Sequence, residues 1–533
     1  MATSRLLRTS AAVFAATALL ISGCSSGGGP AAPDTAASPG RANDAGAERN
    51  TPDDGSSVLA PLPTAIPAAL RPFYAQKLSW HACGVAGFDC ATMKAPLDYD
   101  KPGAGTINLA VARKKATGPG SRLGSLMVNP GGPGGSAIDY LQQYAPQPAA
   151  VRARYDMVAM DPRGVARSQP VECLTDKQMD RYTQTDQTPD SSAEVNKLTT
   201  SYRDFAKGCE TRSGKLLSHV STIEAARDMD MLRAVLGDKK LTYVGASYGT
   251  FLGATYAGLY PTRTGRLVLD GAMDPSLDSR TTNINQTAGF NTAFTAFATD
   301  CIKRKGCPLG NTSAADAGLR LSALFKHLDA HPAETGEARK LTESLATTGV
   351  IAAMYDQGSW PTLRATLAQA KKGSGRGLLA LSDSYYERDA GGHYANQMYA
   401  NPAVNCLDLP PAFTTPDQVR AALPAFRKAS PVFGDAFAWS ALNCAYWPVK
   451  HSGNAHRIEA KNAAPIVVVG TTRDPATPYT WAKSLAAQLS TATLLTYEGD
   501  GHTAYGRGSD CIDTAINTYL LDGTAPPKNK RCT

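Results

Sequence analysis

Hydrophobic positions along the chain form two patterns, short apolar runs and longer stretches with helical spacing. Runs that are apolar at nearly every position are typical of strands buried on both faces, as in a parallel sheet. Such runs lie at 123–128, 241–246, 267–270, 465–470 and 493–497. Helical patterns lie at 222–236, at 480–489 and from Tyr248 to about Tyr260. Strands that alternate with helices in this way predict an α/β fold, with a mostly parallel central sheet flanked by helices.

Helical patterns without strand runs fill the long stretch between the strand at 267–270 and the strand near 465. Examples are 317–328, 363–370 and 416–429. A short crossover would be enough to join two neighbouring strands, so we expect an inserted helical cap over residues 276–460. The core is then expected in two parts, 67–275 and 461–533. A cap of this kind can exclude water from a site and select the substrate.

The strand at 241–246 runs into the pattern Gly245-Ala-Ser247-Tyr-Gly249 and then into a helix of small residues. A Gly-x-Ser-x-Gly turn between a strand and a helix holds the serine on a strained backbone and exposes its hydroxyl. Small flanking residues are needed because strand and helix pass very close to each other. An ordinary glycine turn is the alternative, but the strand-turn-helix context favours Ser247 as a nucleophile.

A serine nucleophile needs a base and an acid that orients the base, and both are expected later in the chain. Asp474 follows the run at 465–470 directly, and His502 follows the strand at 493–497. The carboxyl ends of parallel strands gather at one edge of a sheet, so these side chains are predicted to meet there. Alternatively, Asp474 caps a helix and His502 is a surface residue. Their order and their places at successive strand ends favour a Ser247–Asp474–His502 triad.

A glycine-rich loop, Asn129-Pro-Gly-Gly-Pro-Gly-Gly-Ser136, follows the run at 123–128. Glycines let backbone N–H groups approach a reacting carbonyl oxygen and stabilise its developing negative charge. We assign the two oxyanion donors to the backbone N–H groups of Gly132 and of Tyr248, the residue after the nucleophile. A phosphate-binding loop is the alternative, but the lysine of a Gly-x4-Gly-Lys pattern is missing.

The N-terminus has the pattern of an export signal. Arg5 and Arg8 precede an apolar run at 11–21 that is too short to cross a bilayer, so we expect a signal peptide over 1–23. The run ends in Leu20-Ile-Ser-Gly-Cys24, which resembles a bacterial lipobox and makes Cys24 the expected lipidation site. Ordinary secretory cleavage is the alternative. Residues 24–66 are rich in Ser, Gly, Ala and Pro and are expected to form a flexible tether.

These features predict an exported protein, anchored by lipid to the outer face of the cell membrane and in part released. The net charge of +8 is spread over 533 residues, and no stripe of basic and aromatic residues suggests nucleic-acid binding. Eleven cysteines less Cys24 leave an even ten, which is typical of disulfides in an exported protein. A zinc site is the alternative, yet no Cys-x2-Cys pair is present. Many connectivities are possible, and pairing neighbours in sequence gives Cys83–Cys90, Cys173–Cys209, Cys301–Cys307, Cys406–Cys444 and Cys511–Cys532.

Three motifs together, two of them described above, resemble those of prolyl iminopeptidases and, more closely, of the secreted tripeptidyl aminopeptidases of actinobacteria. Asn129-Pro-Gly-Gly-Pro-Gly-Gly135 is similar to a His-Gly-Gly-Pro-Gly loop, with Asn-Pro in place of the histidine. The segment 155–164, which ends Asp161-Pro-Arg163-Gly164, resembles the strand and turn that follow, although Ala166 stands where glycine is frequent. With the C-terminal Asp and His, the resemblance covers about residues 70–533. It implies an α/β-hydrolase that releases short peptides, tripeptides included, from free N-termini.

An aminopeptidase must also bind the substrate's ammonium group, most simply with a carboxylate at the boundary between cap and core. Asp408 is the candidate, because Cys406 can pin its loop. The expected mechanism needs no metal or organic cofactor, and the expected partners are peptide substrates and the membrane, with the protein a monomer. An esterase or lipase could use the same triad, and a catalytically inactive lipoprotein that binds a ligand is the alternative outside enzymes. The sequence leaves open the number of residues released and the side-chain preference.

Overall fold

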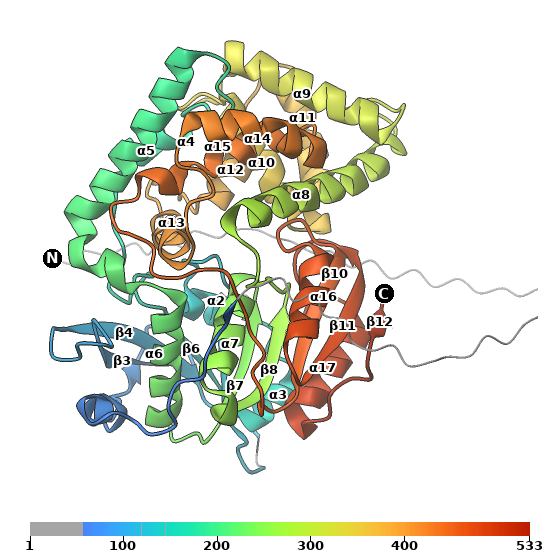
Figure 1. The fold of residues 1–533 in the computed structure, drawn as a ribbon. Helices are drawn as coiled ribbons and strands as arrows, with labels where there is room; N and C mark the ends of the chain where they lie inside the picture. The colour runs from blue at the N-terminus through green and yellow to red at the C-terminus, as the bar shows by residue number, and fades with distance from the viewer. Residues whose placement is uncertain (1–56, 119, 144) are drawn as a thin grey trace, which may run out of the picture. The chain divides into compact units, whose positions relative to one another are not determined.

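The computed structural model describes residues 57–118, 120–143 and 145–533. The expected signal peptide, Cys24 and most of the expected tether lie outside these residues. One large sheet with helices on both faces forms the core, and a helical cap covers the edge where the parallel strands end (Figure 1). Within the described residues, no helix is long and apolar enough to span a bilayer.

The core sheet has ten strands in the order β12-β11-β10-β8-β7-β5-β6-β4-β3-β2. All neighbours from β6 to β12 are parallel, whereas β2, β3 and β4 form an antiparallel extension beside β6. The strands are β2 (His81–Ala82), β3 (Asp89–Pro96), β4 (Thr106–Lys114), β5 (Gly124–Asn129), β6 (Tyr155–Met160), β7 (Leu241–Ala246), β8 (Thr264–Asp270), β10 (Ile466–Arg473), β11 (Ala492–Asp500) and β12 (Lys530–Cys532).

Two hydrophobic layers cover the sheet because side chains alternate between its faces. In β10, Ile466 and Val468 pack into one layer, while Val467 and Val469 pack into the other, and all four are fully buried. The first layer includes α6 (Thr222–Val235), α7 (Tyr248–Leu259) and α16 (Tyr479–Gln488). The second includes α2 (Ala137–Gln143), α3 (Ala149–Arg154) and α17 (Asp510–Asp522). The predicted α/β class and mostly parallel sheet are confirmed.

The cap is built from two separate insertions. The larger insertion contains α8 (Ser279–Ile302), α9 (Ala314–Ala330), α10 (Glu343–Met354), α11 (Trp360–Ala370), α12 (Arg376–Tyr385), α13 (Gln397–Asp408), α14 (Pro416–Ala429) and α15 (Gly434–Ser440). The smaller contains α4 (Asp176–Thr183) and α5 (Ser192–Ser213), which follow β6 and lie in the cap (Figure 1). The sequence analysis placed these two helices in the core.

Contacts between the two insertions explain this difference. Leu198 and Tyr202 of α5 share a buried cluster with Val419 and Phe426 of α14. Ser344 of α10 donates a hydrogen bond to the Thr185 carbonyl oxygen at 2.8 Å. The first half of the apolar face of α5 is therefore buried against the other insertion, whereas Phe205 and Cys209 join the hydrophobic layer of the core. A helical pattern does not say which partner covers which part of the face.

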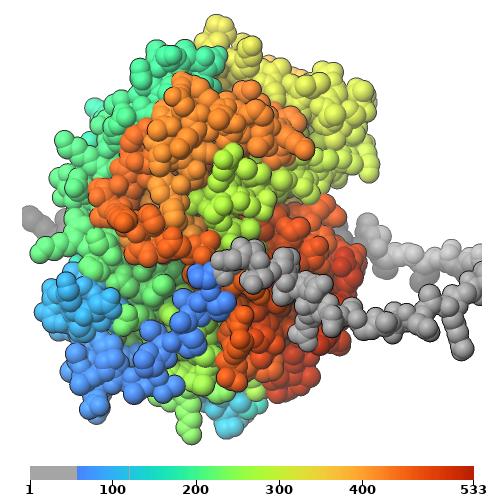
Figure 2. Space-filling view, viewed as in Figure 1, coloured from blue at the N-terminus to red at the C-terminus, as the bar shows by residue number. Residues whose placement is uncertain are grey.

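The end of the expected tether is ordered on the core. β1 (Ser57–Val58) pairs in parallel with β9 (His456–Arg457), where the chain leaves the cap. Leu59 then donates its N–H to the Arg457 carbonyl oxygen, and Leu62 donates to that of Leu259, both at 2.9 Å. Figure 2 shows this blue segment lying on the surface of the core. Residues 57–62, which the sequence assigns to the tether, therefore have backbone partners on the core that their composition does not reveal.

Five disulfides join cysteines that are neighbours in sequence. They are Cys83–Cys90, Cys173–Cys209, Cys301–Cys307, Cys406–Cys444 and Cys511–Cys532. These are the pairs that the sequence analysis gave. The Cys406–Cys444 bridge ties the end of α13 to the segment that leads back to the core, and Cys511–Cys532 ties α17 to the edge strand β12. Disulfides of this number fit an exported protein.

Candidate active site

Ser247 lies on the sharp turn between β7 and α7. Its backbone has φ 56° and ψ −128°, a conformation that non-glycine residues rarely adopt. A side chain at Gly245 would collide with the carbonyl oxygen of Gly249, and one at Gly249 would lie 2.8 Å from the carbonyl oxygen of Asn129. The two glycines are required because strand and helix almost touch. The turn therefore holds Ser247 at the carboxyl edge of the sheet.

Asp474 and His502 meet at the ends of β10 and β11. His502 Nδ1 lies 2.8 Å and 2.9 Å from the two carboxylate oxygens of Asp474. The buried carboxylate also accepts backbone N–H groups from Ala476 at 2.9 Å, Thr477 at 2.8 Å and Thr503 at 3.2 Å. The helix α16 begins after Pro478, so Asp474 does not cap it but orders its own loop and orients His502.

The other ring nitrogen of His502, Nε2, is buried and has no hydrogen-bond partner in the part of the chain that the structure describes. Ser247 and His502 line one cavity of about 370 Å³. From the cap, the Tyr355 carbonyl oxygen accepts the His502 backbone N–H at 2.9 Å, and the Tyr355 ring meets the imidazole edge-on at 5.4 Å. The unpaired nitrogen is therefore available to accept a proton within the cavity.

Asp270 is a residue of this site that the sequence analysis missed. It ends β8, and its carbonyl oxygen accepts the Ser247 N–H at 2.8 Å. Its buried carboxylate accepts the N–H groups of Ala504 at 3.0 Å and Tyr505 at 2.9 Å, and burial raises the pKa of this carboxyl. Asp270 thus links the nucleophile turn to the loop that carries His502. The signal was its place at the carboxyl end of the apolar run 267–270.

The glycine-rich loop packs directly on the nucleophile turn. A Cβ on Gly131 would lie 2.7 Å from the backbone nitrogen of Tyr248, so only glycine fits there. Gly132 lines the cavity beside Ser247, with φ 112°. The Tyr248 N–H opens α7, where backbone donors have no partner within the helix. Both expected oxyanion donors therefore belong to backbone beside the nucleophile.

Cap residues form the opposite wall of the cavity. They are Ala352, Tyr355, Ser384, Tyr385, Glu387, Gln397, Met398 and Asn401. A second cavity of about 230 Å³ shares Tyr355, Tyr385 and Met398 with the first and extends between the cap helices. Aromatic and polar side chains share its wall, and the carboxylate that lines it is Glu343. The site is therefore a covered chamber with a second compartment rather than an open groove.

Negative charge gathers beyond the second cavity. Carboxylate oxygens of Asp186, Asp329 and Glu343 lie within 4.8 Å of one another, a spacing at which they could share a cation. Burial, together with the charges of Asp329 and Asp186, raises the pKa of Glu343 to about 7. An arriving positive charge would relieve both effects. The expectation that no metal takes part in the reaction stays a prediction.

Asp408 does not lie in either cavity, which corrects its expected role. It is the last residue of α13, and its carboxylate is buried against the start of α6. One oxygen accepts the Thr222 N–H at 2.9 Å and the other accepts the Thr222 hydroxyl at 2.5 Å. Burial raises the pKa of Asp408 to about 7. Because Asp408 is buried and lines neither cavity, a substrate ammonium group in the chamber would not meet it.

A mostly parallel sheet with a strained serine turn after one strand and an Asp–His pair at the ends of two later strands defines an α/β-hydrolase. Sequence comparison places the chain more narrowly. The profile of the family described as TAP-like protein matches residues 430–532. The chain belongs to this tripeptidyl aminopeptidase-like family of α/β-hydrolases, which confirms the resemblance found in the sequence.

Three relatives show how far the similarity extends. Serine protease Hip1 of Mycobacterium tuberculosis is 38% identical over 87% of this chain and 92% of its own length. Carboxylesterase B of the same organism is 40% identical over 86% of this chain and 91% of its own. Tripeptidyl aminopeptidase of Streptomyces lividans is 31% identical over 85% and 86%, respectively. The similarity therefore includes both the core and the cap. The chain is a serine hydrolase.

Proposed function

We propose that this protein is a serine exopeptidase that removes short peptides, tripeptides among them, from the free N-termini of peptides or proteins. The observation that carries the proposal is the chamber under the cap, whose inner compartment is lined by Glu343. An endopeptidase must admit a chain that continues on both sides of the scissile bond. A compartment among the cap helices with a carboxylate in its wall instead suits a substrate whose charged N-terminus lies there. The names of two relatives, a serine protease and a tripeptidyl aminopeptidase, support a peptidase.

In this mechanism Ser247 attacks the scissile carbonyl carbon while His502 Nε2 takes the hydroxyl proton. Asp474, hydrogen-bonded to Nδ1, fixes the histidine tautomer and stabilises the imidazolium that forms. Backbone N–H groups of Gly132 and Tyr248 hold the oxyanion. His502 then protonates the departing amine, and water, activated by the same nitrogen, releases the acyl group from Ser247.

Two carboxylates that line the chamber are candidates for binding the substrate's ammonium group. Glu387 lines the same cavity as Ser247, whereas Glu343 lines the inner compartment. Removal of a single residue would place the ammonium near Glu387, and removal of several would place it near Glu343. We assign the role to Glu343, because burial and the neighbouring acids make its charge unfavourable until a cation arrives.

The test compares free and N-acetylated tripeptide p-nitroanilides with wild-type enzyme, Glu343→Gln and Glu387→Gln. Acetylation removes the ammonium and leaves a half-buried carboxylate unpaired, so kcat/KM should fall about 30- to 1,000-fold for wild type. Glu343→Gln should show part of this loss on the free peptide and little on the acetylated one, so that the coupling is read directly. Glu387→Gln is the matched control from the nearer cavity.

Each outcome separates one part of the proposal from the rest. If free and acetylated peptides are cut equally well, the exopeptidase proposal is wrong. The esterase alternative, which the carboxylesterase relative favours, then takes its place. If acetylation matters but only Glu387→Gln responds, the protein releases single residues. An inactive ligand-binding lipoprotein is excluded when a fluorophosphonate labels wild type and fails to label Ser247→Ala.

Export and anchoring form a second part of the proposal. The disulfides fit an oxidising compartment, and Cys24 is the proposed lipidation site, although it lies outside the described residues. Two acyl chains hold a protein on a membrane, whereas one gives only marginal binding. Membrane-fractionated protein should begin with diacylglyceryl-Cys24, and Cys24→Ser should shift it to the soluble fraction. Intact mass showing an unmodified Cys24 in that membrane fraction contradicts this.

A further inference from the structure

The cap helix α13 contacts both sides of the oxyanion hole. Near its start, Asn401 donates its side-chain amide to the carbonyl oxygen of Pro133, the residue after Gly132, at 3.2 Å. A Cβ on Gly134 would lie 2.8 Å from the Gln397 carbonyl oxygen, so loop and helix are in close contact. Asn405, one turn on, donates to Asn401 Oδ1 at 3.0 Å and fixes the orientation of the amide. The helix α13 therefore packs directly against the loop that carries one oxyanion donor, the Gly132 N–H.

The other end of α13 reaches the second donor through a buried chain of hydroxyl groups. Asp408 accepts both the N–H and the hydroxyl of Thr222, and the Thr222 hydroxyl lies 2.5 Å from the phenol oxygen of Tyr248. Tyr248 is the residue after the nucleophile, and its side chain is buried. Cys406–Cys444 braces the same end of the helix. The sequence predicts Asp408 at the substrate, but the residue instead contacts the nucleophile turn through Thr222 and Tyr248.

The direction of this chain follows from the chemistry of the groups. Above about pH 7, where Asp408 is ionised, its carboxylate only accepts. The single Thr222 hydroxyl proton then goes to Asp408, and the Tyr248 phenol donates to Thr222. An asparagine at 408 can keep the chain with its direction reversed, because its amide NH₂ donates to the Thr222 oxygen. An alanine there breaks the chain and leaves the buried Thr222 N–H without a partner.

We propose that Asn401 and Asp408 of α13 are positioning residues for the oxyanion hole, one for the Gly132 loop and one for Tyr248. The inference rests on the proposed function, since it assumes that these two backbone N–H groups stabilise the oxyanion. Neither side chain touches the reacting atoms. The cap thereby takes part in catalysis by fixing donor positions as well as by enclosing the substrate, and small displacements of such donors slow reaction strongly.

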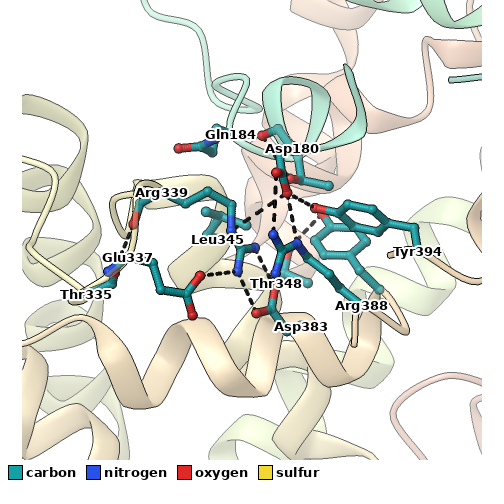
Figure 3. Close-up of polar contacts among 12 residues, drawn as sticks. Asp180, Gln184, Thr335, Glu337, Arg339, Leu345, Thr348, Asp383, Arg388 and Tyr394 are labelled. Atoms are coloured by element: carbon teal, nitrogen blue, oxygen red, sulfur yellow. Dashed lines mark hydrogen bonds and ion pairs between the residues drawn. The ribbon is translucent and has the colours of Figure 1, made fainter. Parts of the chain in front are cut away.

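A purely structural role for the two residues makes a different prediction, and the cap offers a matched control. Figure 3 shows a polar network inside the cap, and none of the residues that it labels lines the cavity of Ser247. Arg339 donates to both carboxylate oxygens of Asp383 at 2.6 Å and 2.7 Å, and Asp180 accepts from Arg388 at 2.9 Å and from Tyr394 at 2.8 Å. Asp383→Ala should destabilise the cap without moving an oxyanion donor.

The experiment measures the second-order rate constant for phosphonylation of Ser247 by a fluorophosphonate, below the melting transition of every variant. This reaction needs the nucleophile and the oxyanion hole but no peptide specificity. Asp408→Ala and Asn401→Ala should each lower the rate constant about 10- to 100-fold. Asp408→Asn should stay within about threefold of wild type, because the hydrogen-bonded chain survives in reverse. Asp383→Ala should react at the wild-type rate despite a lower melting temperature.

The pH midpoint of labelling supplies the second readout. It reports the histidine base, so it should not move in Asn401→Ala or Asp408→Ala if only the oxyanion donors are displaced. The inference is overturned if both variants react at the wild-type rate, or if Asp383→Ala slows labelling as much as they do. Should Asp408→Ala fail to fold, Asn401→Ala decides alone. Failure of the proposed triad looks different, because wild type itself would then not be labelled or Ser247→Ala would be. Failure of the exopeptidase specificity appears in the comparison of free and acetylated peptides and leaves labelling unchanged.

Discussion

Core and cap of this protein are held together by different kinds of contact. In the core, backbone passes so close to backbone that side chains have no room, as between Gly245 and Gly249 at the nucleophile turn. In the cap, the two insertions meet through side chains, as in the Arg388–Asp180 pair of Figure 3. Backbone does come close to backbone within the larger insertion, where a Cβ on Gly349 of α10 would lie 2.5 Å from the Leu378 carbonyl oxygen of α12. The reacting groups lie on the first kind of structure and most of the chamber wall on the second. Chemistry should therefore depend on core positions and on the α13 residues that position the oxyanion donors, and substrate choice and pH response on the other cap positions.

The largest effect that tests this division is loss of the nucleophile. Ser247→Ala should leave the fold intact and lower turnover at least about a thousandfold, as removal of a triad member does. Ser384→Ala is the matched change on the cap side of the same cavity and should alter mainly KM. Steady-state kinetics with circular dichroism checks both. Near-normal turnover in Ser247→Ala would contradict the triad assignment. It would also contradict the proposal that the reacting groups belong to the core.

A methyl group at the nucleophile turn should have the next largest effect. In Gly245→Ala the added Cβ meets the Gly249 carbonyl and the Tyr243 ring, which cannot both move away. Overpacking of this kind costs about 1–3 kcal/mol of unfolding free energy, and labelling of Ser247 should slow as well. Guanidinium chloride denaturation measures the first effect. An unchanged midpoint would mean that strand and helix can separate here, and that the core is no stiffer than the cap.

The cap should show its own pH dependence through Glu343. Its pKa is raised from 4.5 to about 7 in the folded protein, so the folded state binds more protons than the unfolded state between these values. The stabilisation is full below about pH 4.5 and is lost as the pH rises through about 7. Glu343→Gln should therefore be more stable than wild type at pH 8, by about 1 kcal/mol after allowance for partial exposure.

Thermal melting at several pH values checks this prediction, with Glu210→Gln on the exposed face of α5 as the control. The slope of melting temperature against pH should flatten between pH 4.5 and 7 in Glu343→Gln alone. Some slope of the same sign should remain, because the pKa of Asp408 is also raised to about 7. Identical slopes in wild type and Glu343→Gln would show that the inner compartment is well solvated and would weaken Glu343 as the ammonium ligand.

The smallest expected effect comes from a cap glycine that has room. Gly318 lies within α9, and a Cβ there would meet Val432 and Phe294 at 3.4 Å and 3.6 Å, which is ordinary contact. Gly318→Ala should stabilise the protein by about 0.5–1 kcal/mol, because alanine loses less backbone entropy in a helix. Denaturation under the conditions used for Gly245→Ala gives the comparison. Destabilisation by both changes would mean that the cap is packed as tightly as the core.

The predicted parts of this molecule are those whose signal is local. A run such as 466–469 has no polar position to expose, so it must be covered on both faces, and this alone indicates a central strand. Gly245 and Gly249 mark the turn because no other residue fits there, and Asp474 and His502 were found because they follow strands directly. Asp270 carried the same kind of signal, at the end of 267–270, and could have been recognised by the same reasoning.

The tertiary structure decided the parts that depend on which surfaces meet. The helical pattern of α5 shows that one face is buried, but only the fold shows that α14 covers part of it. Asp408 has a carboxylate and a nearby disulfide, and neither reveals that Thr222, far away in sequence, occupies both its oxygens. Periodicity reports how much of a residue is buried and on which face. Which segment covers that face is decided only when distant segments pack together. The contact energy depends on both segments, so the sequence of one segment does not reveal it.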